Sequence, residues 1–318
     1  MAGLDLFVIA LVGAIALAKF LPGPGAMTGA FSLQTIADYG VSLIFFFYGL
    51  KLSPRELKSG LANWQLHTVV QSATFLIFPL LILLLMQFFG HWGNRLFWIG
   101  TFYLAALPST VSSSVVMVSM ARGNIPAAIF NASLSSLAGV FITPLWMGII
   151  LTSGGEAYDL SSVFIKLSLQ VLLPVTLGLL LHKRFGHIAL RNSNRLKVFD
   201  QTVILLIVYT SFCESFINKM FDGHSSTEII LLGAAMVLLF FVVYYIIKFI
   251  SRMLKFSVED EITAVFSGSK KSLVHGTVMS KVLFPGISGV GVILLPLMLY
   301  HTLQLIIVSV IAQRLSKR

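Results

Sequence analysis

Long apolar runs separated by short polar connections dominate this sequence of 318 residues. Runs of roughly 17 to 25 residues have the length that a helix needs to cross a hydrocarbon core of about 30 Å, whereas barrel strands alternate over about 10 residues. Charged residues make up 11% of the chain and hydrophobic residues 57%, whereas soluble domains contain about 25% charged residues. The sequence therefore predicts a polytopic, all-α integral membrane protein.

Ten segments fit this pattern, and we expect ten transmembrane helices. They cover residues 4–20, 36–52, 66–88, 96–120, 124–150, 162–182, 198–218, 227–250, 260–283 and 289–314. The first segment contains Asp5 and has no Lys or Arg before it. A signal peptide would begin with a positively charged region, so we interpret this segment as a first span.

Lysine and arginine are shared unequally between alternate connections, and this asymmetry predicts the topology. One side carries Lys51, Arg55, Lys58, Arg122, Lys183, Arg184, Arg191, Arg195, Lys197, Lys248, Arg252, Lys255, Arg314, Lys317 and Arg318. The other side carries only Lys19, Arg95, Lys166, Lys219 and Lys281. Because cytoplasmic loops carry the excess, both termini are predicted to be cytoplasmic.

Charge and cysteine content exclude several classes of function. The net charge of +10 comes from short loops between apolar runs, so it reflects topology and predicts no nucleic-acid partner. Cys213 is the only cysteine, which excludes an internal disulfide and a multi-thiolate metal site. No span carries a metal-ligand motif or a nucleophile paired with a base, so we expect no enzyme and no cofactor.

Two stretches of the chain resemble each other and indicate an inverted repeat. Residues 107–148 and 266–300 each begin with a polar break and end in an apolar helix that contains Pro144 or Pro296 followed by Leu. Five spans per half is an odd number, so the second copy must be inverted. We predict two five-helix repeats, residues 1–155 and 156–318, a pattern typical of secondary transporters.

The sequence LPSTVSSS, residues 107–114, predicts that the fourth span is broken. Pro108 lacks a backbone donor and clashes with the carbonyl four residues before it. Such a break survives in lipid only where protein or a water-lined cavity faces it. The candidate binding hydroxyls are Ser109, Thr110, Ser112, Ser113 and Ser114. They could bind a cation or a substrate anion, or the segment could be a kink that helps helices pack.

Lys270 and Lys271 lie near the middle of the ninth predicted span. A lysine at a helix centre costs about 2.5 to 3.5 kcal/mol on the insertion scale, so both need a polar environment. On an unbroken helix Ser267, Lys271 and His275 would share one face, while Lys270 would point about 100° away. Gly268 and Gly276 bracket the motif and permit a break. The same polar segment adds Ser269 and Ser272 as candidate binding residues.

The few polar residues of the other spans include a candidate counter-ion for these lysines. Glu214 in the seventh span is the first candidate, although it could instead lie at the outer interface. Gln71 in the third span is a weaker binding candidate. His67 and His301 are isolated histidines, which we expect to be packed residues rather than ligands.

Several spaced motifs resemble the bile acid:sodium symporter superfamily, in its sodium/bile-acid-symporter-like, YfeH-type branch. The motifs are FFFYGLKLS at 45–53, LPSTVSSSVVMVSMARGN at 107–124, NASLSSLAGVFITPL at 131–145, DQTVILLIVYTSF at 200–212 and DEITAVFSGSKKSL at 260–273. The resemblance implies ten helices sorted into a panel domain (spans 1, 2, 6 and 7) and a core domain (spans 3–5 and 8–10). Broken spans four and nine would cross in the core.

The resemblance also implies a sodium site and a substrate cavity between core and panel. Carried over by motif, the sodium ligands would be Ser113, Ser114, Asn131 and Ser135. The ninth span departs from the sodium-coupled pattern, because Phe266 replaces a glutamate and the two lysines replace an amide pair. A sodium ion and a charged lysine would repel each other, so we hypothesise that one lysine stands in for a sodium ion. A proton is then the alternative coupling ion, because a buried lysine can release its proton.

Two classes of function remain open on the sequence. The first is a secondary transporter of an amphipathic organic anion, working by alternating access, with the lipid bilayer and the small molecule as its partners. The second is a membrane regulator or scaffold that keeps the transporter fold and transports nothing. The sequence makes no prediction of the oligomeric state.

Overall fold

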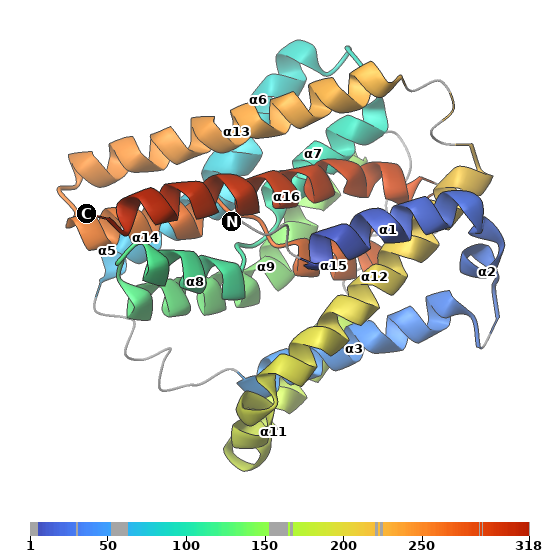
Figure 1. Cartoon of the computed structure of the whole chain (residues 1–318), viewed down its shortest axis with the longest axis horizontal. Helices are drawn as coiled ribbons and strands as arrows, with labels where there is room; N and C mark the ends of the chain where they lie inside the picture. Colours follow the sequence, from blue (N-terminus) through green and yellow to red (C-terminus); the bar gives the residue numbers. More distant parts are fainter. Residues whose placement is uncertain are drawn as a thin grey trace.

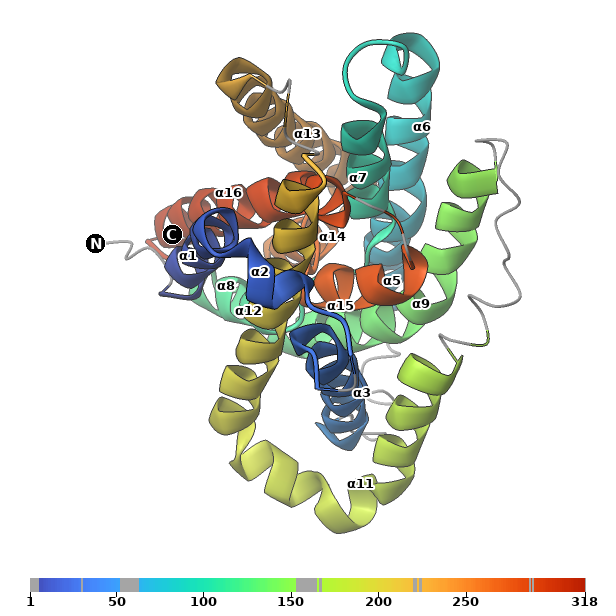
Figure 2. The same ribbon diagram turned by 90° about the vertical axis from the view of Figure 1, so that its right-hand side faces the viewer.

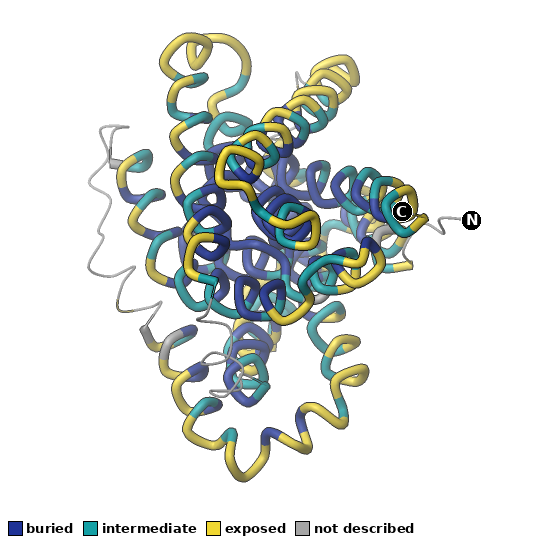
Figure 3. Tube along the Cα trace, turned by 90° about the vertical axis from the view of Figure 1, so that its left-hand side faces the viewer, coloured by how far each residue is buried: buried dark blue, intermediate teal, exposed yellow. Residues whose placement is uncertain are grey.

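The computed structural model describes residues 6–29, 31–51, 63–152, 165, 168–219, 222, 225–285, 287 and 289–317. Within these residues the chain is helical and contains no β-strand, which confirms the predicted all-α class. Buried positions concentrate in the middle of the bundle, and exposed positions follow the outer helices (Figure 3). Many of the exposed residues are large and apolar, as expected for helices that face lipid.

Six stretches of helix in the described part of the chain are long and apolar enough to cross a membrane. They are α3 (Leu33–Lys51), the run α5 (Trp64–Ser72), η2 (Ala73–Ile77) and α6 (Phe78–Phe89), α9 (Ile125–Thr152), α12 (Ser193–Ile217), α13 (Ser226–Met253) and α16 (Val290–Leu315). The other predicted spans coincide with helices that are shorter, interrupted or less apolar, so the count of ten crossings stays a prediction. These elements include α1 (Leu6–Phe20), α2 (Pro22–Ala26), η3 (Ser168–Leu172) and α11 (Leu173–Arg191).

Some sequence predictions fall outside the described residues. The boundary at 155/156 between the two predicted repeats is one of them, and so are parts of the predicted first, second and sixth spans. The basic residues concerned are Arg55, Lys58, Lys166 and Arg318.

Two prolines account for the two π-helical turns. Pro79 is the second residue of α6, directly after η2, and Pro174 is the second residue of α11, directly after η3. A proline cannot donate to the preceding turn, and a wider turn accommodates the lost hydrogen bond. The carbonyls of such a turn are free to bind another group, which is important for η2 below.

The helices pack in two groups (Figures 1 and 2). The peripheral group is defined here as α1, α2, α3, η3, α11 and α12, and α3 lies inside the angle between α11 and α12. All the other helices form the central group, in which α16 packs on α7 and α13. The two groups meet where α12 packs on α16 and on α15 (Leu273–Leu283).

Candidate functional site: two crossing helix breaks

The fourth and ninth predicted spans are each interrupted, as the sequence predicted. The four half-helices are α7 (Arg95–Ala106), α8 (Ser112–Met120), α14 (Val258–Gly268) and α15 (Leu273–Leu283). Leu107 is extended, with ψ of 153°, because a residue before proline is pushed out of the helical region. Ser112 begins α8, and its side chain lies outside the described part of the structure.

The two breaks are bonded to each other although they lie more than 150 residues apart in sequence, and the region where they meet, residues 107–111 and 269–272, is called the crossing below. The Ser109 hydroxyl donates to the Ser267 carbonyl, and the Ser272 amide donates to the Pro108 carbonyl at 2.9 Å. The Ser109 amide donates to the Ser135 hydroxyl of α9 at 2.9 Å. Backbone groups released by each break are therefore satisfied by the other, as a break inside a membrane requires.

Two buried tyrosines donate hydrogen bonds to carbonyls of the ninth span. Tyr103 of α7 donates to the Gly276 carbonyl at 2.6 Å, and Tyr300 of α16 donates to the Ser269 carbonyl at 2.6 Å. The Ser269 hydroxyl donates back to the Val265 carbonyl. This hydrogen bond lies within the last turn of α14, so it does not connect Ser269 to another span.

Lys271 has a side chain that is fully buried and joined to backbone oxygens of two other segments. Its Nζ donates to the carbonyls of Thr74, Ala105 and Leu107 at 2.7, 2.6 and 2.8 Å. Nζ also lies 4.2 Å from the centroid of the Phe78 ring. Three donors and three acceptors match the full hydrogen-bonding capacity of an ammonium group, so Lys271 ties the first break and η2 to the second break.

The backbone of Lys271 is held as firmly as its side chain. Its amide donates to Gln304 Oε1, and the Gln304 amide group donates to the Lys271 carbonyl, both at 2.9 Å.

The two isolated histidines have other neighbours. The side-chain nitrogen of Gln304 lies 2.9 Å from Nδ1 of His301. His67 packs against the Phe130 ring, with centroids 4.3 Å apart. Neither isolated histidine lies in the crossing.

Lys270 is equally buried, but its ammonium group makes fewer hydrogen bonds than that of Lys271. Its Nζ donates to the Ser113 hydroxyl at 3.4 Å. Ser113 in turn donates to Thr110 at 3.0 Å, and Thr110 shares a 2.7 Å bond with Ser114, which reaches the Phe266 carbonyl. Three of the predicted hydroxyls of the fourth span, those of Ser113, Thr110 and Ser114, therefore form a chain that starts at the Lys270 ammonium. Within the described residues, no carboxylate oxygen lies within 4.0 Å of either ammonium.

His275 stands in the first turn of α15 and faces the peripheral group. Its Nδ1 lies 3.0 Å from the hydroxyl of Ser272, which caps α15. Its ring meets the rings of Phe45 and Tyr48 of α3 edge-on, with centroids 6.0 and 5.9 Å apart. Among the described residues Nε2 of His275 is buried and has no hydrogen-bond partner. A donor and acceptor site is therefore open where the two groups of helices meet.

The expected shared face of Ser267, Lys271 and His275 is wrong, because the helix does not continue through residues 269–272. Ser267 ends on α14, and its hydroxyl is buried without a partner among the described residues. His275 belongs to α15, and Lys271 stands between the two helices. The break, rather than a helical repeat, determines where each side chain points.

The four predicted sodium ligands each have hydrogen-bond partners of their own. Asn131 donates to the carbonyl one turn before it and accepts Gln71 Nε2 at 3.2 Å on its side-chain oxygen. Ser135 accepts from the first break, as described above. Ser113 and Ser114 belong to the hydroxyl chain beside an ammonium group. These contacts do not favour a sodium ion on this donor set, since its oxygens already have partners and a cation adjoins them.

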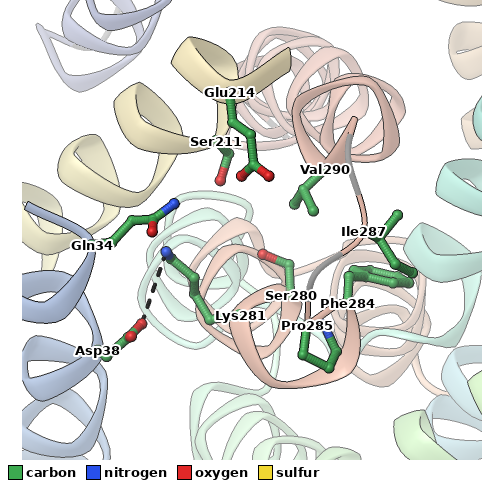
Figure 4. A pocket seen from close by; sticks show the side chains of 10 residues that line it. All are labelled: Gln34, Asp38, Ser211, Glu214, Ser280, Lys281, Phe284, Pro285, Ile287 and Val290. Atoms are coloured by element: carbon green, nitrogen blue, oxygen red, sulfur yellow. Dashed lines mark ion pairs between the residues drawn. The ribbon is translucent and has the colours of Figure 1, made fainter. Parts of the chain in front are cut away.

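Glu214 lies away from the buried lysines, so its interpretation as their counter-ion is wrong. It lines a cavity of about 200 Å³ between the two groups of helices (Figure 4). The Lys281 ammonium of α15 lies in the same cavity, 3.8 Å from a carboxylate oxygen of Asp38 of α3. The other lining residues are Gln34, Ser211, Ser280, Phe284, Pro285, Ile287 and Val290. This outer pocket is a separate polar site from the crossing.

Sequence reasoning missed several residues that build the crossing. Tyr103, Tyr300 and Gln304 are buried polar residues in apolar spans, and that contrast is the signal that could have identified them. Thr74 contributes only its carbonyl, which no sequence pattern reveals. Asp38 is an acid within a predicted span, and this signal was available as well.

Comparison with known proteins places the chain in a family. The model of the SBF-like CPA transporter family matches residues 5–317. "Putative symporter YfeH" of Escherichia coli is 37% identical over 319 residues, which cover 99% of this chain and 94% of that protein. "Sodium/bile acid cotransporter 7" of Danio rerio is 30% identical over 312 residues, which cover 96% and 91% of the two chains.

A third relative, "Uncharacterized protein PA2026" of Pseudomonas aeruginosa, is 40% identical over 314 residues, or 99% of this chain and 93% of that protein. All these matches extend over nearly the whole chain, and they agree with the apolar helices and the polar breaks described above. The protein is therefore an integral membrane transporter rather than an enzyme, and it belongs to the SBF-like CPA transporter family within the bile acid:sodium symporter superfamily.

Proposed function

We propose that the protein is a secondary active transporter of an organic anion, a bile-acid-like or other amphipathic acid, and that it works by alternating access. The observation that carries this proposal is the charge of the crossing. Two buried ammonium groups adjoin each other in sequence, and their partners in the described residues are neutral oxygens. An uncompensated buried charge is costly, so a bound anion would stabilise this region.

The magnitude of the attraction favours the crossing over the outer pocket as the anion site. At about 4 Å and an effective dielectric of 20, one ammonium attracts one carboxylate by roughly 4 kcal/mol. The outer pocket carries Asp38 and Glu214 against Lys281 alone, so its formal charge is negative when all three are ionised. The outer pocket would therefore repel an anionic substrate, and the crossing would attract it.

His275 is the residue that we assign to substrate contact. Its Nε2 is buried without a partner among the described residues, and its ring touches α3 across the boundary between the helix groups. It also stands at the amino-terminal end of α15, where the backbone amides favour a negative charge. A carboxylate or sulfonate at this position could accept a hydrogen bond from the imidazole. The apolar part of the substrate would then contact the Phe45 and Tyr48 rings.

Lys271 is the residue that we assign to the place of a sodium ion. Its ammonium carries the same charge as sodium and is surrounded by three carbonyl oxygens at 2.6 to 2.8 Å. Because the cation is covalently attached, the crossing would be held together without an ion from solution. Coupling would then depend on a proton, released and taken up by Lys270, or on a sodium ion bound elsewhere.

The transport cycle that we propose uses the ten-span, inverted-repeat arrangement. The peripheral group corresponds to the panel domain and the central group to the core domain, and substrate would bind between them. The core would move against the panel and expose the crossing to each side of the membrane in turn. We further propose that the protein lies in a bacterial inner membrane with both termini in the cytoplasm, as the distribution of basic residues favours.

Uptake by proteoliposomes tests this proposal. The purified chain would be reconstituted and offered radiolabelled taurocholate, a bile-acid conjugate, under an imposed sodium gradient, an imposed proton gradient or neither. We expect accumulation that is driven by one of the two gradients and that is abolished by Lys270→Ala and by Lys271→Ala. Dependence on the proton gradient would assign the coupling to Lys270. Lys255→Ala, an exposed lysine outside both sites, is the matched control and should keep wild-type uptake.

Two outcomes would contradict the proposal. Normal sodium-dependent uptake by the Lys270→Ala and Lys271→Ala double variant would exclude a lysine in place of sodium. Failure of a broad panel of organic anions to be transported or to raise the thermal stability of the folded protein would favour the scaffold interpretation, since a ligand that binds only the folded state stabilises it.

A further inference from the structure

An apolar groove lies on the peripheral group, and none of its lining residues belongs to the crossing. It has a volume of about 460 Å³ and is lined by side chains of α3, α11 and the start of α12. Its walls include Phe46, Phe47 and Leu50 of α3, with Leu181, Phe185 and Ile188 of α11. The volume is within the range of about 300 to 1,000 Å³ that ligand pockets occupy, and the lining is almost entirely hydrocarbon.

The helix ends that flank this groove are strongly basic. The segment 183–197, which comprises the end of α11 and the start of α12, carries Lys183, Arg184, Arg191, Arg195 and Lys197, all of them exposed, and it carries no acidic residue. The nearest acid along the chain, Asp200, is already 3.9 Å from the Lys51 ammonium. No salt bridge joins these five side chains to an acidic residue in the described part of the chain, so their charges are available to a ligand.

The basic and apolar residues are interleaved, so one ligand could contact both kinds. The Arg184 guanidinium lies 5.6 Å from the centroid of the Phe185 ring, which lines the groove. Arg191 is three residues after the lining residue Ile188, and Arg195 is three residues after the lining residue Asn192, a spacing that makes side chains neighbours on a helix surface. An arginine guanidinium binds a phosphate with two parallel hydrogen bonds. The head of the ligand is thus predicted to be a phosphate and its body a hydrocarbon chain.

We propose that this groove binds an anionic phospholipid, with an acyl chain against the phenylalanines and the phosphate between Arg191 and Arg195. Exposed apolar residues on the same helices, such as Leu190 at 52% and Val198 at 61% exposure, lie among the exposed basic residues, as expected for a segment at the membrane surface. Clusters of basic residues at the end of a membrane helix attract anionic headgroups. This proposal does not depend on the identity of the transported solute.

The test uses the full chain in nanodiscs of phosphatidylcholine to which phosphatidylglycerol with the same acyl chains is added. Lipid bound to the protein is quantified by native mass spectrometry after release. We expect phosphatidylglycerol to be retained in preference to phosphatidylcholine. Arg191→Gln with Arg195→Gln should lower its apparent affinity by about tenfold or more, because each basic residue contributes about 1 kcal/mol to such binding.

A matched double variant separates a built site from diffuse attraction. Arg314→Gln with Lys317→Gln removes the same charge from exposed positions at the end of α16, and it should leave phosphatidylglycerol binding unchanged. Equal losses in the two double variants, or equal retention of the two lipids by the wild type, would overturn the proposal. Glycerol phosphate, which has the headgroup without the chains, should not compete, and full competition would overturn the assignment of the groove.

Discussion

Lys271 and Lys281 are ten residues apart, and the structure satisfies them in opposite ways. Lys271 is fully buried and donates to three backbone carbonyls. The Lys281 side chain is 16% exposed and pairs with the carboxylate of Asp38, whose side chain is 48% exposed. Fixed dipoles stabilise the charge where water is excluded, whereas a carboxylate that can exchange partners suffices where water has access.

The comparison indicates that the two regions have different structural roles. A cation bound by three backbone oxygens of two other segments links parts of the fold that are expected to stay together. An ion pair between α15 and α3 joins the two groups of helices across a water-accessible cavity, and it can break when they separate. The crossing is therefore expected to be a rigid element, and the outer pocket a place where the groups come apart.

The strongest test of this contrast is Lys271→Met. The methionine is of similar length but cannot donate, so the carbonyls of Thr74, Ala105 and Leu107 would lose a buried partner. We expect the free energy of unfolding to fall by about 3 to 5 kcal/mol, as when one member of a buried charged network is removed. Thermal unfolding in detergent would measure the change, with Lys255→Met as control. Wild-type stability of Lys271→Met would show that the three carbonyls need no donor.

A smaller loss is expected for Tyr103→Phe. This substitution removes the 2.6 Å hydrogen bond to the Gly276 carbonyl and keeps the ring, which meets the Phe284 ring edge-on. An unsatisfied buried acceptor costs about 1 to 3 kcal/mol. Tyr39→Phe, at an exposed position of α3, is the matched control in the same unfolding assay. A change no larger than that of the control would mean that the Gly276 carbonyl has another partner.

Lys270→Met should affect stability less than either change, although Lys270 is as buried as its neighbour. Its ammonium donates one hydrogen bond of 3.4 Å, and removing a poorly compensated buried charge relieves a desolvation cost. We expect the free energy of unfolding to change by less than about 1 kcal/mol, while transport is lost. Unfolding and uptake measured on one preparation would separate the two lysines. A stability loss equal to that of Lys271→Met would show that both have the same structural role.

The smallest effect is expected at the outer pocket. A double-mutant cycle with Asp38→Asn and Lys281→Met should give a coupling energy of about 0.2 to 1 kcal/mol, since the pair is partly exposed. The coupling should decrease when salt is raised from low to high concentration, because exposed charges are screened. A coupling above 2 kcal/mol that is independent of salt would place this pair in the same category as Lys271 and remove the contrast.

The sequence alone was sufficient for the class of fold and for the position of the breaks. Apolar length predicted the membrane helices, and Pro108 with its serines predicted the interruption before α8. The two lysines predicted a polar environment in the second break, and the Ser113 hydroxyl, itself bonded to Thr110, does lie beside Lys270. These features follow from local chemistry, because helix breaking and the cost of a buried charge depend on the residue itself and its immediate neighbours.

Only the tertiary structure decided which partners each charge received. Glu214 was the natural counter-ion by composition, yet it lines the outer pocket, and Lys271 is bound by carbonyls that lie 164 to 197 residues away in sequence. Every residue has a carbonyl, so no pattern of side chains distinguishes the three that are used. Their selection depends on the packing of broken and π-helical turns against each other, and that arrangement exists only once the helices have assembled.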